Sequence, residues 1–112
     1  MSGEVWKYIT EQASIIKSTR LEEMKKLAKQ CEKEELEKIS GFKLFIKPEY
    51  LLNGDLVVKI EASRKIMLGY LTQSITGGFE VSADGEISFY EKPIKVTERT
   101  SVRERWESMV NS

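Results

Sequence analysis

The stretch FKLFIKPEYLLNGDLVVKI, residues 42–60, is the part of the sequence that decides the fold class. Two apolar runs in it flank Asn53-Gly54. An Asn-Gly pair in this setting is among the strongest short-range signals of a β-hairpin, because both residues accept a positive φ. Pro48 has no N–H to donate, so the first strand is expected to be an edge strand or to be bulged there. The stretch predicts an antiparallel hairpin.

Two further β elements are predicted downstream. Residues 79–81 and 87–90 flank Asp84-Gly85, a pair that plays the same role as Asn-Gly, so a second hairpin is expected. Pro93 then interrupts the chain, and the apolar alternation of residues 94–96 predicts one short further strand.

The segment between the hairpins, residues 64–76, has two interpretations. As a helix it has Ser63 as N-cap and Gly77-Gly78 as its end. The apolar residues on one side of that helix are Met67, Leu68, Leu71 and Ile75. As a strand it has alternating apolar residues at positions 66, 68 and 70. The glycine pair favours the helix, because glycine commonly follows the last helical residue.

The N-terminal segment has a helical pattern. No proline or glycine occurs from Glu4 to Ile39, and Ser40-Gly41 supplies an end to the helix. The apolar residues that fall on one helical face are Val5, Ile9, Ala13, Ile16, Met24, Leu27, Ala28 and Cys31. The sequence Thr19-Arg20-Leu21-Glu22 has the form of a capping box and allows a second helix to begin there. The continuous face favours one long helix, with a helix pair as the alternative.

At the C-terminus, a capping box at residues 101–104 precedes an apolar stripe. The stripe consists of Val102, Trp106, Met109 and Val110 and predicts a short closing helix. The predicted fold class is therefore α+β: a long N-terminal helix or helix pair, two antiparallel β-hairpins with a helix between them, and a short C-terminal helix. Residues 1–40 form the helical segment, residues 41–112 form the sheet with its central and C-terminal helices, and we expect the two to make one folded unit.

Composition argues against several functional classes. The 112 residues carry 18 basic and 18 acidic side chains, whereas nucleic-acid-binding proteins usually carry a basic excess. The single Cys31 cannot form an internal disulfide, and we expect it to be a small apolar residue on a buried helix face. There is no signal-peptide pattern and no apolar run of membrane-spanning length, so we expect a cytoplasmic protein with no membrane span.

The residues that most enzymes use are missing. The chain has no histidine, one cysteine and no phosphate-binding glycine loop, so we expect no enzyme activity, no cofactor and no metal site. Carboxylate chemistry is the exception, since it needs only aspartate and glutamate placed close together. The candidates around the second hairpin are Glu80, Asp84, Glu86 and Glu91, which we interpret as solvent-facing strand and turn residues.

The favoured function is a non-enzymatic protein–protein interaction or adaptor domain that self-associates as a homodimer. This hypothesis rests on an apolar face of the N-terminal helix with three-four-three spacing, made of Leu21, Met24, Ala28 and Cys31. The alternative is that this face packs on the sheet of its own domain. Trp106 and Met109 are further candidates for partner binding, because aromatic residues often anchor interfaces.

The second functional hypothesis is a small nucleic-acid-binding accessory protein. Basic residues interleaved with aromatic ones on a sheet can bind phosphates and stack on bases. The basic candidates are Lys43, Lys47, Lys59, Arg64 and Lys65, and the aromatic ones are Phe42, Phe45 and Tyr50. Strand alternation places Lys43 and Lys47 on the face opposite Phe42, which favours a polar outer face over a nucleic-acid site.

Overall fold

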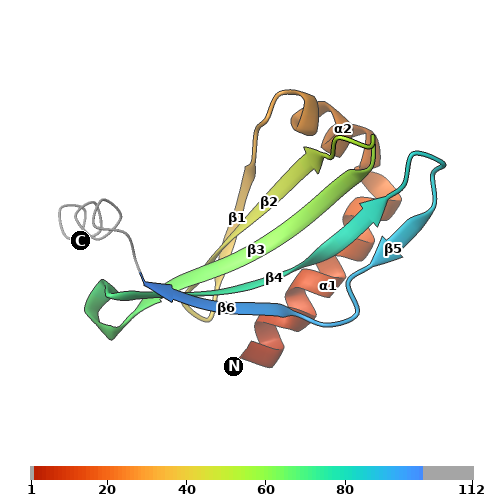
Figure 1. Cartoon of the computed structure of the whole chain (residues 1–112). Helices are drawn as coiled ribbons and strands as arrows, with labels where there is room; N and C mark the ends of the chain where they lie inside the picture. The colour runs from red at the N-terminus through yellow and green to blue at the C-terminus, as the bar shows by residue number, and fades with distance from the viewer. Residues whose placement is uncertain (1, 100–112) are drawn as a thin grey trace.

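The computed structural model describes residues 2–99 and consists of two helices packed on one face of a six-stranded antiparallel sheet (Figure 1). The elements in chain order are α1 (Ser2–Thr19), α2 (Leu21–Lys29), β1 (Glu34–Ile39), β2 (Phe42–Tyr50), β3 (Leu56–Ile66), the one-turn 3₁₀ helix η1 (Met67–Gly69), β4 (Leu71–Val81), β5 (Ile87–Phe89) and β6 (Ile94–Arg99).

The sheet follows the order of the chain. Strands β1 to β4 lie side by side as a meander, and the outer edge of β4 is shared by two short strands. β5 pairs with residues 79–81 of β4, and β6 pairs with residues 71–76. β4 therefore has a different outer neighbour at each of its two ends.

The hydrophobic core lies between the helices and one face of the sheet. Alternate residues of the central strands point into it, among them Leu44 of β2, Ile60 of β3 and Phe79 of β4, all with no exposed surface. From the helices, Ile9, Ile16, Met24 and similar residues complete the cluster. α1 lies across β3 and β4, and α2 packs mainly on β2. The apolar helical face predicted from the sequence is buried here, apart from Leu27, which is partly buried, and Cys31, which is exposed.

The predicted single N-terminal helix is wrong, and the helix pair is the correct alternative. α1 ends at Thr19 and α2 ends at Lys29, well before Ser40-Gly41, which forms the turn between β1 and β2. The predicted capping box does not form, because the Thr19 hydroxyl donates to the Ile15 carbonyl (2.7 Å) and α2 has no side-chain cap. Residues 34–39 have the composition of a helix, but pairing with β2 makes them a strand.

The predicted helix over residues 64–76 is also wrong. These residues are the end of β3, the hairpin tip η1 and the start of β4. Gly77 and Gly78, interpreted as a helix end, lie inside β4. A Cβ on Gly77 would lie 2.5 Å from the Trp6 ring and 2.7 Å from Ile9, so this glycine allows α1 to approach the sheet closely.

The two hairpins with Asn-Gly and Asp-Gly turns are confirmed as β2–β3 and β4–β5, and the short strand at residues 94–96 is part of β6. The ladder between β1 and β2 ends at Ile46, so Pro48 lies where β2 has a single neighbour. The predicted fold class is nevertheless wrong in its arrangement: the order is two helices followed by a six-stranded antiparallel sheet, without a helix between the hairpins. The predicted helix at residues 101–110 lies outside the described residues.

Arg20 connects the helical layer to β1. Its guanidinium donates two hydrogen bonds to Glu23 (both 2.8 Å) and two to Glu34 (2.8 and 2.7 Å). Charge-assisted pairs of this kind are stronger than single contacts, although partial exposure weakens them. We expect Arg20→Ala to lower the free energy of unfolding by about 1 kcal/mol. Lys25→Ala, which removes only the exposed pair with Glu22, is the matched control and should change it by less than about 0.5 kcal/mol.

The same contact makes stability depend on acid pH. The hydrogen bonds from Arg20 hold the pKa of Glu23 below its ordinary value of 4.5. A lowered pKa in the folded state contributes stability above the unfolded-state pKa, and this contribution is lost as the pH falls through the lower, folded-state value. Urea unfolding between neutral pH and acid below 4.5 should therefore show a smaller loss of stability in Arg20→Ala than in the wild type. Equal losses in the two proteins would contradict this role of Arg20.

Candidate functional site

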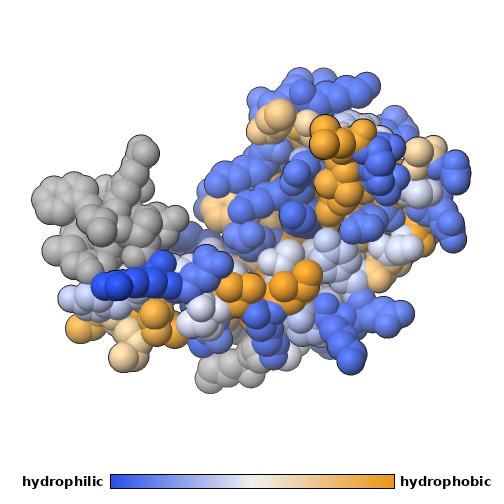
Figure 2. All heavy atoms as spheres, in the orientation of Figure 1, coloured by the Kyte–Doolittle hydropathy of each residue, from blue (hydrophilic) through white to orange (hydrophobic). Residues whose placement is uncertain are grey.

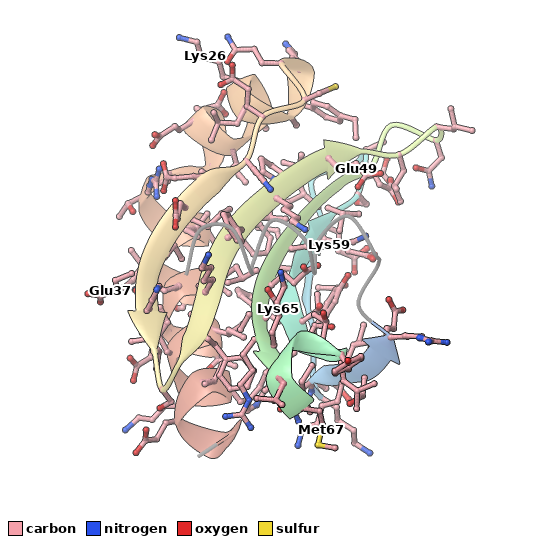
Figure 3. All side chains as sticks on the ribbon, turned by 90° about the vertical axis from the view of Figure 1, so that its left-hand side faces the viewer. Lys26, Glu37, Glu49, Lys59, Lys65 and Met67 are labelled. Atoms are coloured by element: carbon pink, nitrogen blue, oxygen red, sulfur yellow. The ribbon has the colours of Figure 1, made fainter. Side chains whose placement is uncertain are left out.

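The side of the sheet that faces away from the helices is the open face (Figure 3). Because strand residues alternate, each strand that buries one set of side chains presents the other set here. The open face includes Glu35 of β1; Lys43, Phe45, Lys47 and Glu49 of β2; Lys59, Glu61, Ser63 and Lys65 of β3; Thr72, Ser74, Thr76 and Glu80 of β4; and Ile94, Val96 and Glu98 of β6. The face therefore combines residues from five strands and carries both basic and acidic groups.

Curvature of the sheet makes part of the open face a hollow of about 830 Å³. Four small hydroxyl residues line it: Ser63, Thr72, Ser74 and Thr76. The basic residues that border it are Lys38, Lys43, Lys65, Arg99 and, from the helix side of β3, Arg64, against two acidic ones, Glu61 and Glu98. A chain with no net charge thus concentrates positive charge in one concave place.

The lysines of the open face are incompletely neutralised. Lys47 and Lys59 stand directly opposite each other on β2 and β3, an arrangement that destabilises a sheet when the charges are alike. Glu61 neutralises Lys47, with Nζ and Oε1 3.1 Å apart. Within residues 2–99, no acidic group lies within ion-pairing distance of Lys43 or Lys59. These two lysines can therefore pair with an anion from outside the protein.

Phe45 is the aromatic residue of the open face. It lies two residues from both Lys43 and Lys47 on the same side of β2, and its ring is half-buried. The ammonium of Lys33 lies 4.5 Å from the centre of the ring, as in a cation–π contact. Lys33 therefore brings a further positive charge to this part of the face, held against the Phe45 ring.

Four of the five basic residues proposed from the sequence share the open face. In Figure 3, Lys59 and Lys65 lie on the face turned toward the viewer, and strand register places Lys43 and Lys47 with them. Arg64 is different: it lies on the helix side, where its Nε donates to Gln73 (2.9 Å) and its guanidinium lies 4.6 Å from the centre of the Phe42 ring.

The residues proposed for self-association lie in different environments. Met24 and Ala28 are buried in the core and Leu21 packs against it, which corresponds to the alternative in which this helix face covers its own sheet. Cys31 is exposed and follows the end of α2 with a φ of 54°, so it is not the buried helical residue expected. The other two, Trp106 and Met109, lie outside the described residues.

The acidic candidates from the second hairpin do not converge. Glu80, Asp84, Glu86 and Glu91 are all exposed. Over residues 2–99, no three acidic or cysteine side chains are grouped so that they could hold a metal ion. In the same part of the chain, none of the helices has the length and apolar character needed to cross a membrane.

Sequence reasoning missed the hydroxyl residues of the hollow. The favoured helix over residues 64–76 includes Ser74 and Thr76, and a helix does not place them on the open face of a sheet. The signal was present: residues 72, 74 and 76 are all Thr or Ser at a spacing of two, which is the period of a strand.

Searches of protein families, curated proteins and solved structures found no match to this chain.

Proposed function

We propose that this protein is a non-enzymatic binding domain that takes single-stranded nucleic acid on the open face of its sheet. The observation that supports this best is the pair Lys43 and Lys59, which have no acidic partner within residues 2–99 and lie near Phe45 beside a hollow lined by hydroxyl groups. Lysines bind phosphates, the ring offers a surface for stacking, and serine and threonine hydroxyls bind phosphate or sugar oxygens.

The shape of the site favours a single strand over a duplex. Exposed sheet faces bind splayed bases by stacking, whereas reading of duplex DNA usually requires a helix or a two-stranded ribbon that enters a groove. The open face is broad and shallow, and within residues 2–99 the hollow is lined by strand residues and the β1–β2 turn rather than by a helix. The few lysines and the zero net charge imply weak affinity, with a Kd on the order of 10⁻⁵ M at low salt.

A protein partner is the second candidate. β6 pairs with β4 along one edge, and its residues are all exposed, including Ile94 and Val96. Within residues 2–99, no strand pairs with its outer edge, so an extended peptide could add to the sheet there. The basic hollow beside it favours an acidic peptide. An adaptor role would then use this edge rather than the N-terminal helix.

The lysines and the ring give a test that separates the two candidates. For a fluorescent single-stranded 12-mer, fluorescence anisotropy should show that Lys43→Ala/Lys59→Ala weakens binding about tenfold. The slope of log K against log salt should become shallower by about 1.4, since each phosphate contact contributes about 0.7 for single strands. Phe45→Leu should weaken binding at least about fivefold if a base stacks on the ring.

The matched control is Lys17→Ala/Lys26→Ala, which removes two exposed lysines from the helical layer and should leave the affinity within about twofold. A short polyglutamate peptide serves as the alternative probe. If that peptide binds with the same dependence on Lys43 and Lys59 but Phe45→Leu has no effect on either ligand, the protein partner is favoured. If no 12-mer binds at low salt, the nucleic-acid proposal is wrong.

A further inference from the structure

The two ends of the sheet differ in charge and both expose apolar side chains. One end is the β3–β4 hairpin tip, residues 66–71, which we name the basic tip. The other end is formed by the β2–β3 turn, residues 50–55, together with the β4–β5 turn, residues 82–86, which we name the acidic turn pair. β3 spans 11 residues between these ends, a length of about 36 Å. Figure 1 shows them at opposite ends of the molecule.

The residues of the basic tip itself are apolar and have a strained backbone; the basic residues flank them. Leu68 is 97% exposed and Met67 is 68% exposed, and Tyr70 beside them is also exposed. Met67 and Leu68 have φ values of 52° and 56°, a left-handed conformation that side chains other than glycine, asparagine and aspartate rarely adopt. Strain of this kind concentrates at functional positions. Figure 2 shows hydrophobic spheres at this tip, at the lower left.

The charges around the tip are mainly basic. Between Glu61 and Glu80 the chain has no acidic residue, and its only charged residues are Arg64 and Lys65. Strand pairing adds Arg99, opposite Leu71 of β4, and one acid, Glu98. The tip therefore exposes apolar side chains next to mainly basic residues.

The acidic turn pair is its counterpart. The two turns are joined by a hydrogen bond from the Ala83 N–H to Asp55 Oδ1 (3.1 Å). Leu52 is fully exposed, with Tyr50 and Leu51 beside it. Residues 48–58 and 79–91 contain no lysine or arginine. The acidic residues that accompany these turns are Glu49, Asp55, Glu80, Asp84, Glu86 and Glu91.

We infer that the basic tip of one copy of this protein binds the acidic turn pair of the next, so that copies associate head to tail. Contact between unlike ends brings opposite charges together and buries Leu68 and Leu52 of different copies. A two-fold contact between like ends would place basic groups against basic groups. A head-to-tail contact that does not close on itself gives open chains.

The contact is expected to be weak and sensitive to salt. Both patches are small, so the interface falls in the low range of under about 1,200 Å² in which contacts are transient. Charges at exposed ends are screened at high ionic strength. In sedimentation at low salt, the weight-average mass should rise at least about twofold from micromolar to submillimolar protein, and 1 M salt should reduce this rise.

A pair of variants that introduce a charge tests the direction of assembly. Leu68→Glu places an acid at the basic tip, and Leu52→Lys places a base at the acidic turn pair. Both side chains are exposed, so folding should be unaffected and circular dichroism can verify this. Each variant alone should remain monomeric at all concentrations. Mixed in equal amounts, the intact tip of Leu52→Lys should bind the intact turn pair of Leu68→Glu and give a dimer but no larger species.

The mixture separates this inference from its alternatives. A wild-type protein that stays monomeric at 1 mM, or a mixture of variants that stays monomeric, would overturn it. Self-association retained by both variants would place the contact elsewhere, for example on the helices. Binding of the wild type to anionic vesicles, lost in Leu68→Glu while no self-association occurs, would assign the tip to a lipid surface instead. The experiment contains no nucleic acid, so its outcome is independent of the proposed function.

Discussion

Replacing Gly78 with alanine is expected to lower the free energy of unfolding by about 3 kcal/mol or more, a large part of the stability of a domain this size. Gly78 lies in the middle of β4 with a φ of +131°, and an added Cβ would collide with the backbone carbonyl oxygen of Val58 on β3. The clash involves backbone, so a side-chain rotation cannot relieve it. Urea unfolding followed by circular dichroism measures the change.

Gly3→Ala is the matched control for this substitution. Gly3 lies in the first turn of α1, and its Cβ would have no neighbour within 4 Å. Alanine is the better helix former, so stability should stay the same or rise by up to about 1 kcal/mol. A Gly78→Ala protein as stable as Gly3→Ala would mean that β3 and β4 do not pair in the register found here.

Replacing Phe79 with alanine should destabilise the protein by about 3–5 kcal/mol, the range typical of large aromatic residues in a core. Phe79 has no exposed surface and lies between the sheet and the helices. The substitution removes the transfer free energy of the ring and leaves a cavity beneath α1. Thermal and urea unfolding both report this loss.

Phe89 provides the control, because it is the same residue type on the neighbouring strand. Its ring centre lies 5.6 Å from that of Phe79, but 45% of its surface is exposed. Phe89→Ala should therefore cost about 1 kcal/mol, mainly the aromatic contact. Because the two rings lie on the same face of the sheet, equal losses from both substitutions would mean that Phe89 is buried as deeply as Phe79 and would contradict the edge position of β5.

The hairpins were predictable because their signals are local. Asn53-Gly54 and Asp84-Gly85 fix the direction of the chain over four residues, and nothing distant is required to interpret them. The apolar face of α1 and α2 was predictable for the same reason, since its spacing is set by the helix alone. These features gave the α+β class but not the arrangement of its elements.

The errors came from segments whose structure depends on distant partners. Residues 34–39 are rich in glutamate and lysine, and only pairing with β2 makes them extended. Gly77 and Gly78 resemble a helix end, but the first makes room for α1 and the second adopts a positive φ within a strand. The long strand β4 was therefore divided between a helix and a hairpin.

The candidate site was half predictable. The alternation of β2 predicts that Lys43 and Lys47 share a face opposite Phe42. The same alternation places Phe45 on the face of the two lysines, so the aromatic residue of the site was also predictable. Arg64 does not join the other basic candidates, because the alternation of β3 places it on the helix side against Phe42. The hydroxyl residues of β4 and the contribution of β6 required the tertiary structure, since they join the lysines only through the sheet.

An NMR titration of the ¹⁵N-labelled protein with the single-stranded 12-mer tests the central claim most directly. The account predicts that at low salt the amide signals of the open face move, including those of Lys43, Phe45, Ser63 and Ser74, and that those of α1 do not. Shifts confined to the helices, or no shifts at submillimolar oligonucleotide, would contradict the claim that the open face is the binding site.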